Sequence, residues 1–492
     1  MGTAGTVTIG QPLPNSTGAT AIADGTYPSV FNNASVDPNF GVTSPIFLQS
    51  LNPSTGAVLN TFNATAAAAA AGQNVVTSFS SKSELSLNLT SGGSALTFMG
   101  YQATPNQLDI SNANTPGIIE PGNTDIARAT YREVAQVNAA GGIQLTTTNA
   151  YPGNNPRAVI LNPNGLYFAA GNAGNGNGGP LVTAATGVQI IVPGQNATAA
   201  TPGTSPVGQY NITQNGYAAD KTAKDNNFRG ETVFGNTLYV SKGSGGNGIN
   251  TVYQVGAAGS FSSLTQANTS LLSPSITILP GFPTNLANST PSPTNVISHP
   301  FGLFFANAST LYVADEGSGS TKDFSTTPYE AGGLQKWSLT NGTWTLDYEL
   351  RGTLIGSSYT VGIGANSITT SVDGLRDLTG KVNADGTVTL YAVTSTIGSA
   401  LGDAGADPNQ VVDITDMLAA TMASQVTAEN FTVLETAPYG DVLRGVALAP
   451  NVPEPSTWSL MLLGFAGLGF AFHRSRRRAV TRVRGRALVR EA

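Results

Sequence analysis

The sequence predicts an all-β protein: a β-propeller of six four-stranded blades with room for a seventh, followed by a short C-terminal transmembrane helix. A short strand, a Gly/Asn turn and an aromatic strand recur along the chain, and a second hairpin follows the copies after a variable insertion. Charged residues make up only 10% of the 492 residues, and Gly, Asn, Ser and Thr are abundant, which favours turn-rich β structure over helices. Two hairpins in one unit make a four-stranded antiparallel sheet, which is one blade of a propeller.

Four segments carry the repeat clearly, and a weaker copy runs from Leu85 to Phe98. The clear copies are residues 157–168, 229–240, 301–315 and 376–392. Second hairpins are predicted at 46–58, 133–145 and 334–346. A seventh blade would have to lie at 260–295 or at 352–370, where the pattern is weak.

The two ends of the body are expected to join. Residues 443–449 match the first strand of a unit but have no hairpin after them, whereas the first hundred residues hold later strands without an obvious first one. A last strand that completes the first blade would close the body, residues 1–450, without an exposed edge. The Leu-Tyr-Val-Ala-Asp string at 311–315 resembles the repeats of NHL-like and YVTN-like propellers. Because the unit lengths are uneven, a β-helix or sandwich adhesin is the alternative fold.

Two segments have the composition of helices. Residues 66–71 are an alanine run, and residues 414–424 are helix-prone with Asp413 or Thr415 available as a cap. We expect both to be local decorations of the blades.

The last forty residues have the order of a sorting signal. A Pro-Glu-Pro motif precedes an apolar run at 458–472, and a basic cluster follows it. The motif is Val452, Pro453, Glu454 and Pro455, and the basic cluster is Arg474, Arg476, Arg477 and Arg478. An apolar helix satisfies its own backbone in hydrocarbon, but a secure span needs roughly 20 apolar residues, so this run fits a transient anchor. The arginines would act as a membrane stop on the cytoplasmic side and leave the body outside.

Residues 451–492 therefore resemble the PEP-CTERM sorting domain, whose bearers are substrates of exosortases in Gram-negative bacteria. The resemblance implies export, a transient stay in the inner membrane, processing near the motif by an exosortase-type enzyme, and a final place at the cell surface or in the extracellular matrix. Export also needs an N-terminal signal, and residues 1–9 have neither a basic start nor a continuous apolar core. We therefore expect the true start to lie upstream of Met1.

The composition suits a protein outside the cytoplasm. There is no cysteine, so neither a disulfide nor a thiolate metal site can form and stability must come from a packed core. Eight of the 22 basic residues and one of the 28 acidic residues follow Phe472, which leaves the body with 14 basic and 27 acidic residues and a net charge near −13. Such a body is not expected to bind nucleic acid.

The inventory of catalytic residues is thin. His299 and His473 are the only histidines, and neither a Gly-x-Ser-x-Gly elbow nor a phosphate-binding loop occurs. No catalytic residue and no cofactor is predicted. Calcium could bind Asp315, Glu316 and Asp323, because clustered loop oxygens suit a hard cation, but the spacing of a dedicated calcium loop is absent and solvated carboxylates are favoured.

One column of the aligned repeats carries arginine. Arg157, Arg229, Arg376 and Arg444 open the first strand of their units, and in the remaining clear unit Phe301 takes this position, two residues after His299. First strands line the channel of a propeller, so these side chains would ring one mouth and could bind carboxylate, sulfate or phosphate groups. The alternative, which we favour, is that each arginine pairs with a carboxylate such as Glu231 or Asp377 and ties the ring together.

Three classes of function fit the sequence. The leading one is a non-catalytic binding or scaffold protein in the extracellular matrix, with acidic exopolysaccharide as a candidate ligand. The second is a propeller enzyme, lactonase-like or lyase-like, that uses His299, Glu231, Asp315 and the arginines in its channel. The third is a calcium-stabilised ligand receptor.

Overall fold

The computed structural model describes residues 8–14, 20–21, 24, 27, 41–79, 81–123, 125–174, 179–208, 210–221, 224–264, 276–292, 295–320, 332–397 and 405–451. Contacts divide the chain into a first unit, Met1–Pro450, and a second, Asn451–Ala492. The predicted sorting motif, membrane helix and basic cluster therefore lie outside the described residues. None of the helices that the structure does describe is both long and apolar enough to span a membrane.

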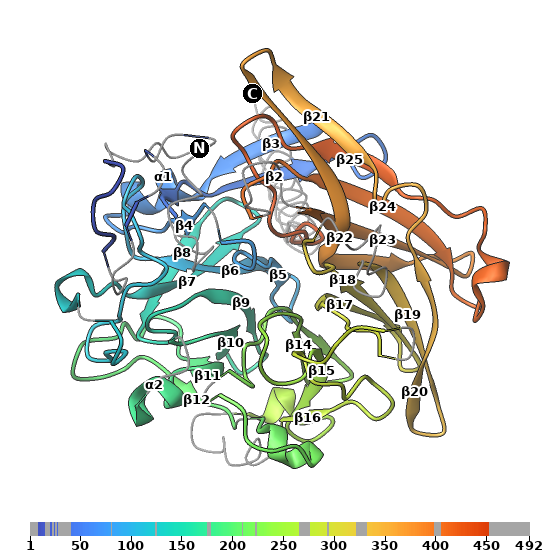
Figure 1. Ribbon diagram of the computed structural model, residues 1–492, viewed down its shortest axis with the longest axis horizontal. Coiled ribbons are helices and arrows are strands. Elements are labelled where there is room, and N and C mark those ends of the chain that lie inside the picture. Colours follow the sequence, from blue (N-terminus) through green and yellow to red (C-terminus); the bar gives the residue numbers. More distant parts are fainter. Residues whose placement is uncertain are drawn as a thin grey trace, which may run out of the picture. The chain divides into compact units, whose positions relative to one another are not determined.

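The first unit is a propeller of antiparallel sheets that follow one another in chain order around a ring (Figure 1). Blade 1 contains β5 (Asn88–Leu89), β6 (Ala95–Tyr101), β7 (Arg132–Asn138) and β8 (Ile143–Thr148). Blade 2 contains β9 (Pro156–Leu161), β10 (Tyr167–Gly171), β11 (Gly187–Ile191) and β12 (Ser205–Pro206). Blade 3 contains β13 (Glu231–Phe234), β14 (Thr237–Lys242), β15 (Thr251–Val255) and β16 (Ile276–Ile278).

Blades 4 and 5 complete the set of large sheets. Blade 4 contains β17 (Pro300–Asn307), β18 (Thr310–Asp315), β19 (Gly333–Thr340) and β20 (Thr343–Leu350). Blade 5 has five strands, β21 (Ser358–Ile363), β22 (Asn366–Val382), β23 (Thr387–Ile397), β24 (Gln410–Met417) and β25 (Thr432–Thr436). The β-propeller prediction is confirmed. Four of the five predicted repeats supply the first hairpin of a blade, and the repeat at 376–392 supplies the β22–β23 hairpin of blade 5.

The count of six four-stranded blades is not reached within the described residues, where five large sheets are found. The predicted hairpin at 46–58 forms β2 (Phe47–Leu51) and β3 (Val58–Asn63), but these two strands pair only with each other. Two further short strands, β1 (Thr43–Ser44) and β4 (Thr77–Ser78), form a separate pair. The hairpin packs through Leu48 and Phe62 against the apolar cluster that contains Phe98 and Ala135 of blade 1.

The terminal strand predicted at 443–449 does not form, and this prediction was wrong. Side-chain bonds hold the segment instead of a strand ladder. Asn409 Oδ1 accepts a hydrogen bond from the backbone N–H of Leu443 at 2.7 Å, and Asp377 Oδ2 accepts one from that of Val446 at 3.0 Å. A continuous ladder is therefore not needed for this segment to lie against the ring.

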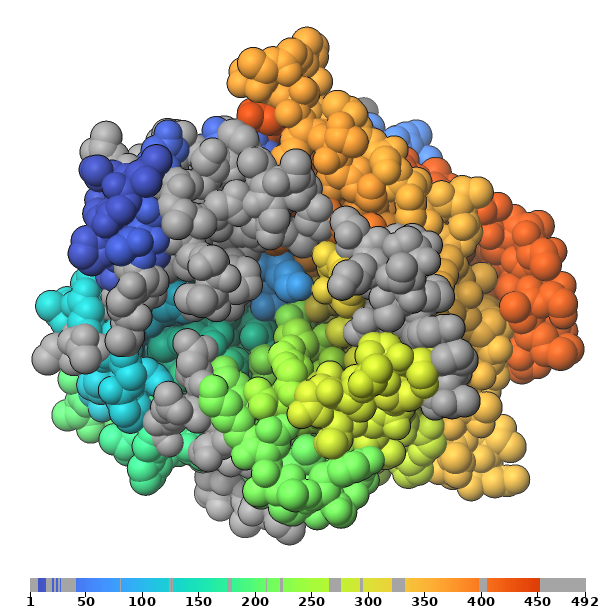
Figure 2. Space-filling model, viewed as in Figure 1, coloured from blue at the N-terminus to red at the C-terminus, as the bar shows by residue number. Residues whose placement is uncertain are grey.

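Neither weakly patterned stretch forms a seventh blade in the part of the chain that the structure describes. Within 260–295, the strand β16 is the fourth strand of blade 3. Residues 352–370 instead lengthen blade 5, because β21 pairs with the first half of the 17-residue β22. This hairpin projects from the surface (Figures 1 and 2), and Ile363 near its tip is 90% exposed.

The blades pack face to face, as the central position of β18 illustrates. All six of its residues are buried, and successive side chains of a strand point to opposite faces. Leu311 and Val313 accordingly pack in the cluster shared with blade 3, whereas Tyr312 and Ala314 pack in the cluster shared with blade 5. A strand buried on both faces reads as a continuous apolar run, which is why the Leu-Tyr-Val-Ala string stands out in the sequence.

Of the two predicted helices, one is confirmed. The alanine run forms the helix α1 (Ala64–Ala70), whose first turn is capped by the side chain of Asn63. The second α-helix, α2 (Pro180–Ala184), is a single short turn. The helix predicted at 414–424 was wrong: its first residues belong to β24, and only Ala423–Gln425 is helical, as a 3₁₀ turn.

Asp377 joins both ends of the body to blade 5. Its Oδ1 accepts a hydrogen bond from the Ser86 hydroxyl at 3.0 Å, and its Oδ2 accepts bonds from the backbone N–H of Leu87 at 2.9 Å and of Val446 at 3.0 Å. Because the carboxylate is buried, water could not accept these hydrogen bonds if Asp377 were removed. One side chain of β22 thus holds the segment before β5 and the segment after β25.

The variant Asp377→Ala is expected to lower the free energy of unfolding by about 2–3 kcal/mol, because it leaves backbone donors of both terminal segments without an acceptor. Chemical denaturation followed by circular dichroism measures this loss. Asp385→Ala is the matched control, since Asp385 is exposed and bonds only to Thr387 in the adjacent turn. Equal stability of the two variants would contradict the closing role of Asp377.

Candidate functional site

The first strands of blades 1 to 4, and β22 in blade 5, lie nearest to the middle of the ring (Figure 1), and the predicted arginines stand at or beside these inner strands. All four side chains are buried, with exposed fractions of 3% for Arg157, 3% for Arg229, 2% for Arg376 and 7% for Arg444. An open ring of arginines would leave the guanidinium groups accessible. Their burial means that most of their hydrogen bonds must be made within the protein.

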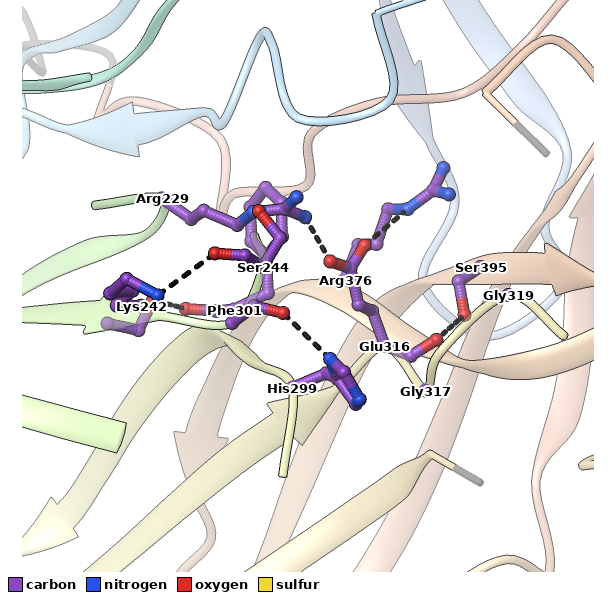
Figure 3. Close-up of polar contacts among 12 residues, drawn as sticks. Arg229, Lys242, Ser244, His299, Phe301, Glu316, Gly317, Gly319, Arg376 and Ser395 are labelled. Carbon is purple, nitrogen blue, oxygen red and sulfur yellow. Dashed lines mark hydrogen bonds and ion pairs between the residues drawn. The ribbon is translucent and has the colours of Figure 1, made fainter. Parts of the chain in front are cut away.

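Glu316 is the partner of two of these arginines. Its Oε1 bonds to Arg229 Nη1, and its Oε2 lies 3.2 Å from Arg376 Nε. The carboxylate lies between the two guanidinium groups (Figure 3). Because the three residues come from blades 3, 4 and 5, this triad connects three neighbouring sectors of the ring. The partners suggested from the sequence, Glu231 and Asp377, were wrong for these two arginines.

The triad keeps Glu316 ionised. Burial alone would raise the pKa of its carboxyl, but the positive charges of Arg229, Lys82, Arg376 and His299 outweigh burial and lower the pKa to about 2. The backbone carbonyl of Glu316 also accepts a 2.5 Å hydrogen bond from the Ser395 hydroxyl of blade 5 (Figure 3). Glu316 is therefore fixed both in charge and in position.

The other two arginines also bind across sector boundaries. Arg157 Nη1 of blade 2 bonds to Asn227 Oδ1 and donates to the backbone carbonyl of Phe228 at 2.7 Å, just before blade 3. Arg444 Nη2 bonds to the carbonyls of Phe79 and Gly405. The column of arginines is thus a set of ties between blades, which supports the structural alternative derived from the sequence.

Phe301 takes the fifth position of the arginine column, and His299 lies two residues before it. The ring of Phe301 lies under the Arg229 guanidinium, 5.7 Å from its carbon to the ring centroid. His299 Nδ1 lies 2.9 Å from the carbonyl of Gly243 (Figure 3). The backbone N–H of His299 donates to Asp315 Oδ1 at 3.0 Å. His299 therefore joins blades 3 and 4 and is not paired with Glu231, the other residue of the proposed catalytic set.

The carboxylates predicted for calcium have other partners. Asp315 accepts hydrogen bonds from the Ser298 hydroxyl at 2.7 Å, from Gln335 Nε2 at 2.9 Å and from the backbone of Gly317 at 3.0 Å. Glu316 is held by two arginines, and Asp323 lies outside the described residues. Across the described ranges, no three His, Asp or Glu side chains gather in a way that could hold a metal ion.

The sequence reasoning missed Lys82, which lies in the turn before blade 1. The charges of Glu316, Arg229, Arg376 and Asp373 all act on its ammonium group, which places this group beside the triad. Burial and the two arginines lower its pKa, against the opposing effect of the two carboxylates. Lys82 precedes the weakest repeat and has no counterpart in the aligned column, so no sequence signal pointed to it.

Lys82 differs from its cationic neighbours in two ways. Its side chain is partly exposed, whereas the arginines are buried. Its Nζ has no hydrogen-bond partner among the residues that the structure describes. It is therefore the least enclosed cation of this centre. The centre formed by Lys82, Arg229, Glu316 and Arg376 is called the cationic centre below.

Two other buried groups near the inner strands were also missed or misassigned. Lys242 donates to the Ser244 carbonyl at 3.0 Å and to Asn250 Oδ1 at 2.8 Å, and burial lowers its pKa to about 7 (Figure 3). Burial raises the pKa of Glu231 well above its usual range, and neither carboxyl oxygen has a hydrogen-bond partner within the described part of the chain. Both side chains are buried.

Comparison with known proteins identifies the C-terminal segment. Residues 451–478 match the family model described as the PEP-CTERM protein-sorting motif. The chain carries a PEP-CTERM sorting motif. This motif marks the protein for export and implies processing by an exosortase-type enzyme, as the residues from Val452 onward predicted. No curated protein matches the chain.

Solved structures resemble the body only distantly. A putative 6-phosphogluconolactonase from Bacteroides fragilis has 9% identity and a TM-score of 0.34, over 85% of this chain and 87% of its own. A protein from Lactobacillus plantarum has 12% identity and a TM-score of 0.32, over 82% of this chain and 98% of its own. A gluconolactonase from Xanthomonas campestris has 11% identity and a TM-score of 0.28, over 71% and 94%. Similarities of this size carry no inference about the activity of the PEP-CTERM protein.

Proposed function

We propose that this exported propeller is a non-catalytic binding protein that holds an anionic group at the cationic centre, with Lys82 as the contact. One observation carries the proposal: Lys82 is a partly exposed residue whose charge acts beside two arginines, and its side chain has no hydrogen-bond partner within the described ranges. An ammonium group in such surroundings gains most from an added anion, because nearby positive charge and a low dielectric strengthen the attraction.

The ligand class that fits this site is an acidic exopolysaccharide. Its carboxylate or sulfate groups would meet Lys82, while the arginines behind it supply fixed positive charge without giving up their own bonds to Glu316. The rest of the body is acidic, so attraction of a polyanion is confined to this centre. The sorting motif is consistent with this role, since it directs the protein to the compartment in which such polymers are found.

The finer localisation is part of the same proposal. The apolar run at 458–472 anchors the chain in the inner membrane until an exosortase-type enzyme cuts near the Pro-Glu-Pro motif, and the body then passes to the cell surface or matrix. The basic cluster after the run supports this order by retaining the C-terminus in the cytoplasm.

The variant Lys82→Gln is expected to weaken binding of acidic oligosaccharides by about tenfold or more, because a charge-assisted bond contributes about 1.5–3 kcal/mol. A glycan array selects an acidic probe, and isothermal titration calorimetry measures its affinity for both proteins. Lys381→Gln is the matched control, since Lys381 is an exposed lysine on blade 5 far along the same strand as Arg376. Equal affinity of the wild type and Lys82→Gln, or capture of neutral glycans only, would refute the proposed site.

A further inference from the structure

Blades 4 and 5 share a buried lysine–aspartate pair that the proposed function does not use. Lys336 on β19 places its Nζ 2.7 Å from Oδ2 of Asp416 on β24. The exposed fractions of the two side chains are 1% and 0%. The pair lies inside the apolar cluster between the two blades, in which Leu334, Val388 and Ile414 are also buried.

Two tyrosines hold the aspartate from the other side. The Tyr348 hydroxyl donates to Asp416 Oδ1 at 2.6 Å, and the Tyr312 hydroxyl donates to Oδ2. The Lys336 ammonium lies 5.2 Å from the centre of the Tyr348 ring and 5.5 Å from that of Tyr312. The aromatic walls exclude water, and the hydroxyls draw electron density from the carboxyl carbon.

A second carboxyl completes the group. The carboxyl of Glu429 lies beside Asp416, since its Oε1 accepts a hydrogen bond at 3.0 Å from the backbone N–H of the next residue, Met417. Burial, and after it the interaction with Asp416, raise the pKa of Glu429 to about 7, so Glu429 can both give and take a proton near neutral pH.

We propose that Lys336 and Asp416 condense to an intramolecular amide, an isopeptide bond between β19 and β24, with Glu429 as the proton-transfer group. An amine held against a carboxyl in a dry pocket is in a near-attack arrangement, and this proximity replaces the activation that a free amine and acid would need. Because a low dielectric disfavours separated charges, the ammonium–carboxylate pair can pass a proton and become a neutral amine and a neutral acid.

The reaction balances without any other reactant. Lys336 Nζ gives one proton to the Asp416 carboxylate, and its lone pair then forms a bond to Cγ. Glu429 takes the second proton from Nζ and delivers its own to the departing oxygen, so that the bond from Cγ to Oδ2 breaks and one water leaves. In the product, Oδ1 remains as the amide oxygen that accepts from Tyr348, and the amide N–H can donate to the carbonyl of Met417, which already lies 2.7 Å from Nζ.

The bond would give this protein a covalent cross-link, which it cannot form through disulfides. The chain has no cysteine for a disulfide, and it works outside the cell. Residues 336 and 416 are 80 positions apart, so the link would close a long loop and restrict the unfolded chain. It would also join two neighbouring blades permanently.

Peptide mass spectrometry of the purified, folded full chain tests the proposal. After incubation for several days and digestion, we expect a branched peptide whose mass equals the Lys336 and Asp416 peptides less one water, with no cleavage by trypsin at Lys336. Asp416→Ala supplies the unlinked reference. Glu429→Gln should slow formation by about 100-fold, the usual contribution of a positioned general acid–base. Glu435→Gln, a partly buried carboxyl on β25, should leave the link intact.

Two results would overturn the proposal. The first is recovery of both linear peptides at full mass from wild-type protein whose β structure is verified by circular dichroism. The second is full linking in Glu429→Gln, which would remove the assigned role of Glu429. The wild-type result does not depend on whether any variant folds.

Discussion

Replacing Glu316 with Gln is expected to lower the free energy of unfolding by about 3–5 kcal/mol, because it leaves two buried guanidinium groups without their counter-ion. Arg229 and Arg376 are 3% and 2% exposed, and water cannot take the place of the carboxylate. The effect should appear as a lower denaturant midpoint with an unchanged slope, measured by urea unfolding.

A triple variant distinguishes lost charge compensation from lost packing. Glu316→Leu combined with Arg229→Met and Arg376→Met removes all three charges, and replacing a buried ion triad with apolar residues is often neutral or stabilising. We expect it to be more stable than Glu316→Gln. A Glu316→Gln protein as stable as the wild type would contradict the tying role of the triad.

The second large effect is a loss of stability as the pH rises, caused by Glu133. This residue on β7 is 0% exposed, and burial raises the pKa of its carboxyl from its usual 4.5 to about 8. The folded protein therefore retains a proton that the unfolded chain has already lost. The contribution of this proton to the free energy of unfolding is fully present below pH 4.5 and is lost as the pH rises through 8.

The variant Glu133→Gln should remove this loss. At pH 8 the cost in the wild type is on the order of 4 kcal/mol, so Glu133→Gln is expected to be the more stable protein at that pH and to differ little from the wild type at pH 4.5. Urea unfolding at both pH values, with the exposed Asp385→Asn as control, measures the difference. Parallel pH profiles for the wild type and Glu133→Gln would show that Glu133 titrates normally.

Local patterns predicted the hairpins of the propeller well. The aromatic strand that contains Leu311-Tyr312-Val313 is buried on both faces, and the turns between strands carry Gly or Asn. Each hairpin can therefore be predicted from a few consecutive residues. The same local reasoning failed for 414–424. Residues Val411, Val412 and Ile414 are β-branched and pair with β23 in a strand ladder, which outweighs the helix propensity of the residues after them.

Long-range partners could not be predicted in the same way. The column of arginines was visible from the repeats, but the sequence suggested Glu231, which is two residues from Arg229, whereas the actual partner Glu316 is 87 positions away. The contribution of the terminal segment was misjudged for a similar reason: Arg444 donates to the backbone carbonyls of Phe79 and Gly405, and its neighbours donate to the side chains of Asn409 and Asp377, instead of forming a strand ladder. Lys82 belongs to no repeat, so only the folded chain brings it to the triad.

The most direct test of the roles assigned to Lys82 and the arginines compares the variants Lys82→Gln and Arg157→Gln. For each variant, the melting temperature is measured, and the affinity for one acidic oligosaccharide is measured at low temperature. We predict that Lys82→Gln melts like the wild type but loses most of its affinity, and that Arg157→Gln melts earlier but binds with wild-type affinity while folded. The reverse pattern, with binding lost in Arg157→Gln and retained in Lys82→Gln, would contradict the assignment of Lys82 as the ligand contact and the arginines as ties.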